Sequence, residues 1–119
     1  GELSRIMLIL RELIAIGDGV STLVFDEIDT GISGRMAAAV GKKLKSLAAS
    51  HQVVVITHLP QIASLADHHM AVRKRPEDGR MVTSVQVLDK EERTEEIAQL
   101  LAGEEISDSA REQAQRMLG

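Results

Sequence analysis

The chain has 119 residues, no cysteine, one aromatic residue and a formal net charge of −4. The lack of cysteine excludes disulfides and thiolate metal sites, the lack of Trp and Tyr removes the usual platforms for stacking single-stranded nucleic acid, and the acidic balance gives no overall basic surface for DNA. No apolar run approaches the roughly 20 residues that span a bilayer. From the length we expect one domain, residues 1–119. Because the chain starts at Gly1 rather than Met, we expect it to be cut from a larger cytoplasmic protein.

The first half of the chain predicts two helices and two strands. Apolar residues recur at steps of three and four over residues 3–16, the pattern of an amphipathic helix, and a short apolar run then predicts a buried strand from about Thr22 to Asp26. Ser33 is a suitable N-cap for a helix from about Gly34 to Ala49, and the apolar run 53–56 is typical of a central parallel strand. Strand, helix and strand would form a right-handed βαβ unit. The second helix should bury Met36, Val40, Leu44 and Leu47.

The second half predicts a hairpin between helices. Pro60 suits the first turn of a short helix, which we expect to run from Gln61 to Ala66. Strands are expected over 69–75 and 80–88, joined by a turn at Pro76–Gly79. Two C-terminal helices should follow, one over residues 91–102 and a last one capped by Ser107. The expected fold class is therefore α/β, a mainly parallel sheet with flanking helices, a β-hairpin and C-terminal helices.

Three acidic residues lie within four positions at the end of the first predicted strand: Asp26, Glu27 and Asp29. Open α/β sheets bind ligands at the carboxyl ends of their strands. One acid there could hold a hydrated metal ion and the next could take a proton from water. Adjacent residues on a strand point to opposite faces, so both can serve one site only where the strand is ending. The alternative is a pair of surface acids, with Asp29 forming an Asx-type turn.

His58 follows the second predicted strand. If the two strands are parallel neighbours, His58 shares one edge of the sheet with Asp26 and Glu27, where it could donate a hydrogen bond to a phosphate oxygen. The alternative is a structural histidine. Two further clusters receive no site: Arg73-Lys-Arg75 is interpreted as a solvated face rather than a DNA contact, and His68-His69 has no partner ligand for a metal.

Four stretches resemble the motifs of ABC-type ATPase heads, in their order and spacing. Gly1-Glu-Leu-Ser-Arg5 resembles the end of the signature motif, Thr22–Glu27 a Walker B motif, Asp29–Gly34 the D-loop, and Thr57-His58 the switch histidine. The runs Asp-Glu-Ile-Asp-Thr-Gly-Ile-Ser-Gly and Thr-His-Leu-Pro-Gln-Ile-Ala narrow the resemblance to the RecN family, bacterial SMC-like proteins of DNA double-strand-break repair. The resemblance covers essentially all of residues 1–119 and implies the C-terminal lobe of an ABC/SMC-type P-loop ATPase head.

This resemblance implies ATP and Mg²⁺ as cofactors and a role for each site residue. Asp26 would hold Mg²⁺ through its water shell, and Glu27 would position and deprotonate the attacking water. His58 would contact the γ-phosphate. Asp29 would contact the opposite subunit and help set the geometry of the water.

The signature motif is present only as a remnant. Gly1, Glu2 and Ser4 would face the nucleotide held by another subunit, at the N-terminus of the first helix. The family signature begins with Ser-Gly before Gly1, so its phosphate-contacting serine is absent. The Walker A sequence G-x-x-x-x-G-K-[ST] is absent too. We therefore expect the isolated chain to lack ATPase activity.

The resemblance implies a part of an SMC-like ATPase acting in recombinational repair of DNA double-strand breaks. Its partners would be the N-terminal Walker A lobe of the same protein, a second protomer through head–head contact, and DNA through the full-length protein, with no membrane. Its location would be the bacterial cytoplasm, in association with the nucleoid. The alternatives are the head of another SMC-like or Rad50-like ATPase, a non-catalytic dimerisation module, or a nuclease with a carboxylate metal site of Asp26, Glu27, Asp29 and His58.

Overall fold

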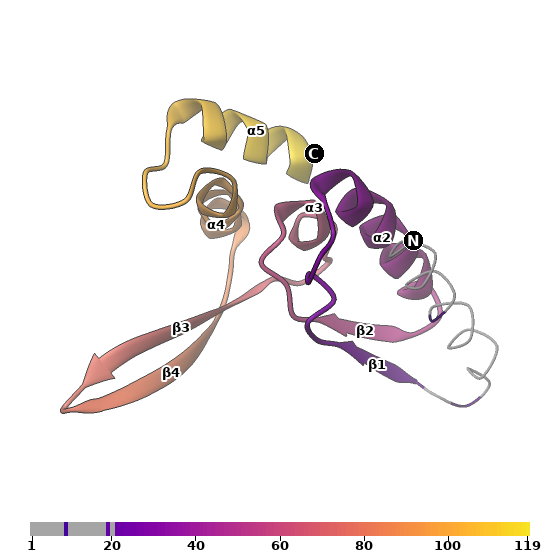
Figure 1. Cartoon of the computed structure of the whole chain (residues 1–119), viewed down its shortest axis with the longest axis horizontal. Helices are drawn as coiled ribbons and strands as arrows, with labels where there is room; N and C mark the ends of the chain where they lie inside the picture. Colours follow the sequence, from indigo (N-terminus) through magenta and orange to yellow (C-terminus); the bar gives the residue numbers. More distant parts are fainter. Residues whose placement is uncertain (1–8, 10–18, 20) are drawn as a thin grey trace. The chain divides into compact units, whose positions relative to one another are not determined.

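The computed structural model describes residues 9, 19 and 21–119 (Figure 1). The helix expected over residues 3–16 lies almost entirely outside the described residues, as do Gly1, Glu2 and Ser4 of the signature remnant. The described elements, in chain order, are β1 (Thr22–Phe25), α2 (Gly34–Leu47), β2 (Gln52–Val55), α3 (Pro60–Ala63), β3 (Met70–Glu77), β4 (Arg80–Val87), α4 (Lys90–Ala102) and α5 (Asp108–Leu118). The chain divides into two compact units, one ending at Leu65 and one beginning at Ala66. That the whole chain forms a single lobe stays a prediction.

In the first unit, β1 and β2 form a parallel pair with α2 between them in the sequence (Figure 1). Thr22 lies opposite Gln52, and Phe25 lies opposite Val55. The predicted strand–helix–strand unit is thus confirmed. Ser33 caps α2 as predicted, its hydroxyl oxygen accepting a hydrogen bond of 3.4 Å from the backbone N–H of Met36.

The core of this unit lies between the sheet and α2. Leu23 of β1 and Ile62 of α3 pack with the buried side chains of α2. Each such burial stabilises the fold by about 1.5–3 kcal/mol. Met36, predicted to be buried, is only half-buried, and Ala37 takes the inward position instead. The buried residues of α2 are Ala37, Val40, Gly41, Leu44 and Leu47.

The apolar run 53–56, predicted to be a central parallel strand, does pair in parallel with β1. The strand is Gln52–Val55, and its burial alternates, with Val53 and Val55 packing against the core. Val54 and Ile56 are exposed, as is Val24 on the neighbouring strand. The alternation follows because α2 covers one face of this pair (Figure 1).

In the second unit, β3 and β4 form an antiparallel hairpin, as predicted. Its turn is shorter than the predicted Pro76–Gly79, because pairing continues through Pro76 to Glu77. Asp78 and Gly79 have φ values of 48° and 76°. Two left-handed residues in a two-residue loop match the type I′ turn, whose twist fits a hairpin. Pro76 is tolerated because β3 is an edge strand, where a missing N–H need not cost a ladder bond.

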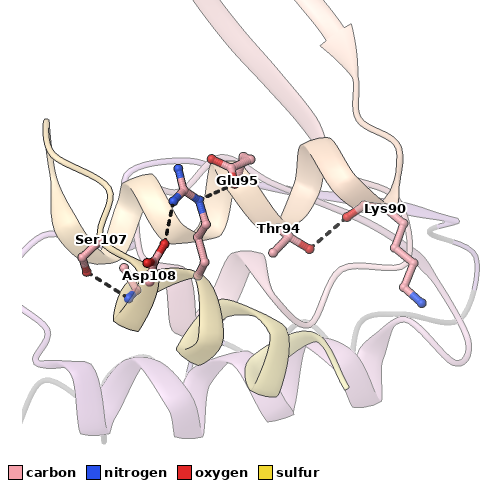
Figure 2. A network of polar contacts seen from close by, with 7 residues as sticks. Lys90, Thr94, Glu95, Ser107 and Asp108 are labelled. Atoms are coloured by element: carbon pink, nitrogen blue, oxygen red, sulfur yellow. Dashed lines mark hydrogen bonds and ion pairs between the residues drawn. The ribbon is translucent and has the colours of Figure 1, made fainter.

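The helices α4 and α5 begin with side-chain caps. Asp89 and Glu92 form a capping box at α4, in which each backbone N–H donates to the other residue's carboxylate at 3.1 and 2.8 Å. Ser107 caps α5 as predicted, accepting from the N–H of Ala110 at 3.1 Å (Figure 2). The buried hydrophobic residues of the second unit are Ala71, Ile97, Ala98, Ala110 and Ala114.

A charged network also joins α4 to α5. Figure 2 shows Glu95 of α4 and Asp108 of α5, both of which accept hydrogen bonds from the guanidinium of Arg111, at 2.7 and 3.2 Å. These side chains are exposed or partly exposed, so the pairs contribute little to stability. Among the described residues, no helix has the length and apolar character that crossing a bilayer requires.

Candidate functional site

The first wall of the site begins where β1 stops. The strand ends at Phe25, and Asp26 and Glu27 are exposed in the loop that follows. Glu27 has a φ of 59°, in the left-handed region. This conformation is uncommon for a residue with a Cβ and costs of order 1–3 kcal/mol, which proteins tolerate most often at functional sites. Because the backbone turns here, two consecutive acids can line the same pocket, as a continuing strand would not allow.

The second wall comes from the end of β2. The backbone N–H of Ile56 donates a hydrogen bond of 2.9 Å to the carbonyl oxygen of Phe25, so the pairing continues to the rim of the sheet. In a parallel pair both carboxyl ends lie at the same edge, so Thr57 and His58 emerge beside the acids of the first loop. A pocket of about 440 Å³ lies at this edge and is lined by Asp26, Glu27, Asp29, Thr30, Ile56, Thr57 and His58.

The two walls are tied together by the carboxylate of Asp29, whose side chain is only 5% exposed. The hydroxyl of Thr57 donates to both of its oxygens, at 2.7 and 2.9 Å. The backbone N–H of His58 donates to Oδ2 at 2.7 Å, and Nδ1 of the His58 ring lies 3.0 Å from the same oxygen. A buried carboxylate needs such donors, because an unpaired buried charge is strongly destabilising.

Thr57 also joins the site to the helix behind it. Its hydroxyl oxygen accepts a hydrogen bond of 3.0 Å from the backbone N–H of Leu59, the N-cap residue of α3. The hydroxyl therefore donates on one side and accepts on the other. A close approach fixes α3 against α2: a Cβ at Gly41 would lie 2.8 Å from Cδ1 of Leu65 and 3.2 Å from the carbonyl oxygen of Gln61. A side chain at this position would therefore require Leu65 and the backbone of α3 to shift.

The structure thus brings together all the predicted site residues of the two loops, Asp26, Glu27, Asp29 and His58. Sequence reasoning gave Asp29 no partner within the chain and gave Thr57 no role of its own. No periodic pattern could have revealed these contacts, because they join residues 28 and 29 positions apart.

The positions of these side chains limit the ways in which they could hold a metal ion. Within residues 9, 19 and 21–119, no group of three or more His, Asp or Glu side chains is placed to hold a metal ion. The four-residue metal centre of the nuclease hypothesis is therefore not formed. The exposed carboxylate of Asp26 at the strand end fits a different mode, because Mg²⁺ keeps most of its waters and needs only one or two carboxylates beside substrate phosphates.

Two clusters of the second unit, Arg73–Arg75 and His68–His69, were left without a site, and that interpretation stays a prediction. Arg73 donates to both carboxylate oxygens of Glu96, at 3.1 and 2.5 Å, and this hydrogen bonding raises the pKa of Arg73. The basic run therefore has an acidic partner of its own. His69 is half-buried, and burial, with the nearby Arg93 cation, lowers its pKa, whereas its neighbour His68 is exposed.

Comparison with known proteins gives close sequence relatives. No family model matches the sequence. The chain is 48% identical over 118 residues to "DNA repair protein RecN" of Deinococcus radiodurans, 43% over 118 residues to that of Halalkalibacterium halodurans and 42% over 118 residues to that of Bacillus subtilis. Each match covers 99% of this chain but only 20–21% of the relative, so the chain spans about one fifth of the length of these proteins.

A solved structure shares the fold. It comes from work on the ATP-driven dimerization and DNA-stimulated activation of SMC ATPases, with a TM-score of 0.59 and 21% sequence identity. The similarity covers 77% of this chain and 55% of that one. The α/β fold with a parallel strand pair, an antiparallel hairpin and C-terminal helices is therefore shared with that structure, and the predicted fold class is confirmed.

Proposed function

We propose that this chain, whose sequence matches RecN proteins over almost its whole length, is part of an SMC-like ATPase that acts in recombinational repair of DNA double-strand breaks. The observation that carries the proposal is the meeting of Asp26, Glu27 and His58 in one pocket, at the carboxyl edge of a parallel strand pair. Phosphoryl transfer needs positioned charge and a positioned water more than covalent chemistry by the protein, and this edge offers the residues for both.

Each side chain has a part in ATP hydrolysis. Asp26 would hold Mg²⁺ through the water shell of the ion, which would supply positive charge to neutralise the phosphates. Glu27, exposed at the pocket and turned by its left-handed backbone, orients the attacking water and takes its proton. His58 makes a hydrogen bond to the γ-phosphate from the end of the neighbouring strand.

The active site is composite. No Walker A sequence occurs in these 119 residues, so the phosphate-cradling loop comes from an N-terminal lobe of the same protein. A second protomer completes the site by head–head contact, to which Gly1, Glu2 and Ser4 of the signature remnant and the loop of Asp29 contribute. DNA binds through the full-length protein, in the bacterial cytoplasm at the nucleoid. The 119-residue chain alone is inactive.

A non-catalytic dimerisation module is the second candidate. It would keep the fold and the head contact but would not use Glu27. The identities of 42–48% with RecN proteins favour this family over other SMC-like or Rad50-like heads. The nuclease alternative has no support from the described residues, in which no three protein ligands converge.

The test is ATP turnover by the native full-length protein and by its Glu27→Gln variant. We expect the variant to bind nucleotide but to lose turnover by about 10²–10⁴-fold, the usual contribution of a general base. Glu105→Gln is the matched control, because Glu105 is an exposed acid outside the pocket. Mixing the native 119-residue chain with a chain that carries the Walker A lobe and the complete signature should restore turnover that neither shows alone. Turnover unaffected by Glu27→Gln would leave only the dimerisation module.

A further inference from the structure

We propose that Asp29 is a positioning residue for His58, which holds the imidazole with its proton on Nδ1 and leaves Nε2 as the nitrogen that meets a ligand in the pocket. The geometric part needs no assumption about activity. Its consequence for phosphate chemistry rests on the proposed function.

The first step is the burial of Asp29 and the direction of its bonds. The side chain of Asp29 is 5% exposed, whereas that of His58 is 80% exposed. The carboxylate is thus a fixed point inside the fold, and the imidazole extends from it toward the pocket that both residues line. Two contacts reach the same oxygen, Oδ2, from the backbone N–H of His58 at 2.7 Å and from its ring at 3.0 Å. Backbone and ring are therefore held together, which leaves the side chain little freedom to rotate.

The second step is the location of the proton. An ionised carboxylate can only accept hydrogen bonds, and Nδ1 lies 3.0 Å from Oδ2, so a hydrogen on Nδ1 is favoured over a lone pair that faces the carboxylate. In the neutral ring this favours the Nδ1–H tautomer, because the two nitrogens share one proton. Nε2 is then an acceptor, and it becomes a donor to a phosphate oxygen only in the imidazolium form. Without Asp29 the neutral ring would be free to protonate Nε2 instead.

The third step is the rigidity of the connection. The hydroxyl of Thr57 donates to Asp29 and accepts from the N–H of Leu59 at the start of α3. A displacement of the loop that follows β1 would therefore carry the ring of His58 with it. Under the proposed function, contact of this loop with a second protomer changes the position of His58 without any direct contact with the ring. Asp29 is a positioning residue in this account because it acts through His58.

The test is the tautomer of His58 in the full-length protein labelled with 15N-histidine. Long-range 1H–15N correlations distinguish Nδ1–H from Nε2–H, and the His58→Gln variant assigns the signal. The spectrum is recorded without nucleotide at the alkaline end of a pH series, where the 15N shifts no longer change with pH. We expect Nδ1–H, the opposite of the tautomer that dominates in free histidine. Nε2–H in the native protein would overturn the proposal, and this result depends on no variant being able to fold.

Two variants distinguish the effect of direct contact with His58 from the effect of a nearby negative charge. Asp29→Ala removes the acceptor that faces Nδ1, so the proton should move to Nε2, as in free histidine. Asp26→Asn removes an acid of the same pocket that makes no bond to His58, so Nδ1–H should remain. A retained Nδ1–H in Asp29→Ala would also overturn the proposal.

Kinetics give a second readout. Asp29→Ala should lower kcat by roughly 100-fold with a smaller change in KM, because a misplaced group costs rate more than ground-state binding. An unchanged kcat together with an unchanged tautomer would overturn the proposal. Should the native tautomer be Nδ1–H while Glu27→Gln leaves turnover intact, the proposed function falls and the assignment of Asp29 stands.

Discussion

The N–H of Ile56, one residue past the end of β2, donates a hydrogen bond of 2.9 Å to the carbonyl oxygen of Phe25, the last residue of β1. This bond holds the two strand ends in register up to the rim of the sheet. The next residues along each chain segment, Asp26 and Thr57, therefore enter their loops side by side. The site is thus a direct consequence of parallel pairing, because only a parallel pair brings two carboxyl ends to one edge.

The left-handed backbone of Glu27 predicts that one substitution at this position can raise stability and abolish turnover. Glu27→Gly removes the Cβ that makes a φ of 59° unfavourable, and should raise the free energy of unfolding by about 1 kcal/mol while abolishing turnover. Thermal unfolding measures the first effect and ATP hydrolysis the second. Asp78→Gly is the control, because Asp78 also has a positive φ, of 48°, but in a type I′ turn that suits Asp, so it should gain less stability and leave turnover unchanged. A Glu27→Gly protein less stable than the native one would contradict this account of the strain.

Removing the carboxylate of Asp29 should be costly for the fold. Asp29→Ala leaves the hydroxyl of Thr57 and the N–H of His58 without their acceptor in a partly buried place, so we expect a loss of about 2–4 kcal/mol in the free energy of unfolding. Denaturant unfolding at neutral pH measures it. Thr57→Val keeps the bond from the N–H of His58 but removes the hydroxyl that donates to Asp29 and accepts from the N–H of Leu59, so we expect a loss of about 1–3 kcal/mol. No loss in Asp29→Ala would show that the hydrogen bonds to this carboxylate contribute nothing to stability.

The local features of this fold could be predicted from the sequence, and the long-range ones could not. Ser33 and Ser107 were identified as caps because capping depends on residues three positions away. The acids at the end of β1 were found for the same reason, since strand and loop are contiguous. The pairing of Asp29 with Thr57 joins loops 28 residues apart, and no local pattern records it.

The errors at element ends have separate causes. Pro76 was placed in the turn because proline is common there, but an edge strand also accepts it, and the Asp78-Gly79 pair alone makes the turn. The apolar run 53–56 was predicted as a central parallel strand, a type that is usually covered on both faces, whereas the burial of Gln52–Val55 alternates. Periodicity cannot tell such a run from one in which a single face is covered.

The contact between α2 and α3 predicts that Gly41 tolerates no large side chain. Gly41→Leu would push α3 away, since even a Cβ there lies 3.2 Å from the carbonyl oxygen of Gln61. We expect a loss of about 1–3 kcal/mol in the free energy of unfolding, the usual cost of overpacking. Lys42→Leu introduces leucine at the next position of α2, which is exposed, and should change the free energy of unfolding by less than about 0.5 kcal/mol. Comparable losses of stability in the two variants would mean that α3 can move away from α2 at little cost in free energy.

Because α3 follows directly on Leu59, the Gly41→Leu variant should also disturb the site. A displaced α3 would pull on the hydrogen bond between the N–H of Leu59 and the hydroxyl of Thr57. The His58 signal in the 15N-histidine spectrum should shift in Gly41→Leu and stay in place in Lys42→Leu. A shift in both would point to a general effect of the added leucine.

The second unit should lose stability as the pH falls, through His69. Burial and the Arg93 cation lower the pKa of His69, against an opposing effect of Glu96. A histidine whose pKa is depressed in the folded state binds its proton more tightly when unfolded, so stability is fully present above the unfolded pKa of about 6.5 and declines as the pH falls below it. The free energy of unfolding should therefore decrease between pH 7.5 and pH 5.5, and His69→Gln should make that decrease shallower. His68→Gln is the matched control, because His68 is the exposed neighbour. An equally steep decrease in His69→Gln and in the native protein would assign the pH dependence to other groups.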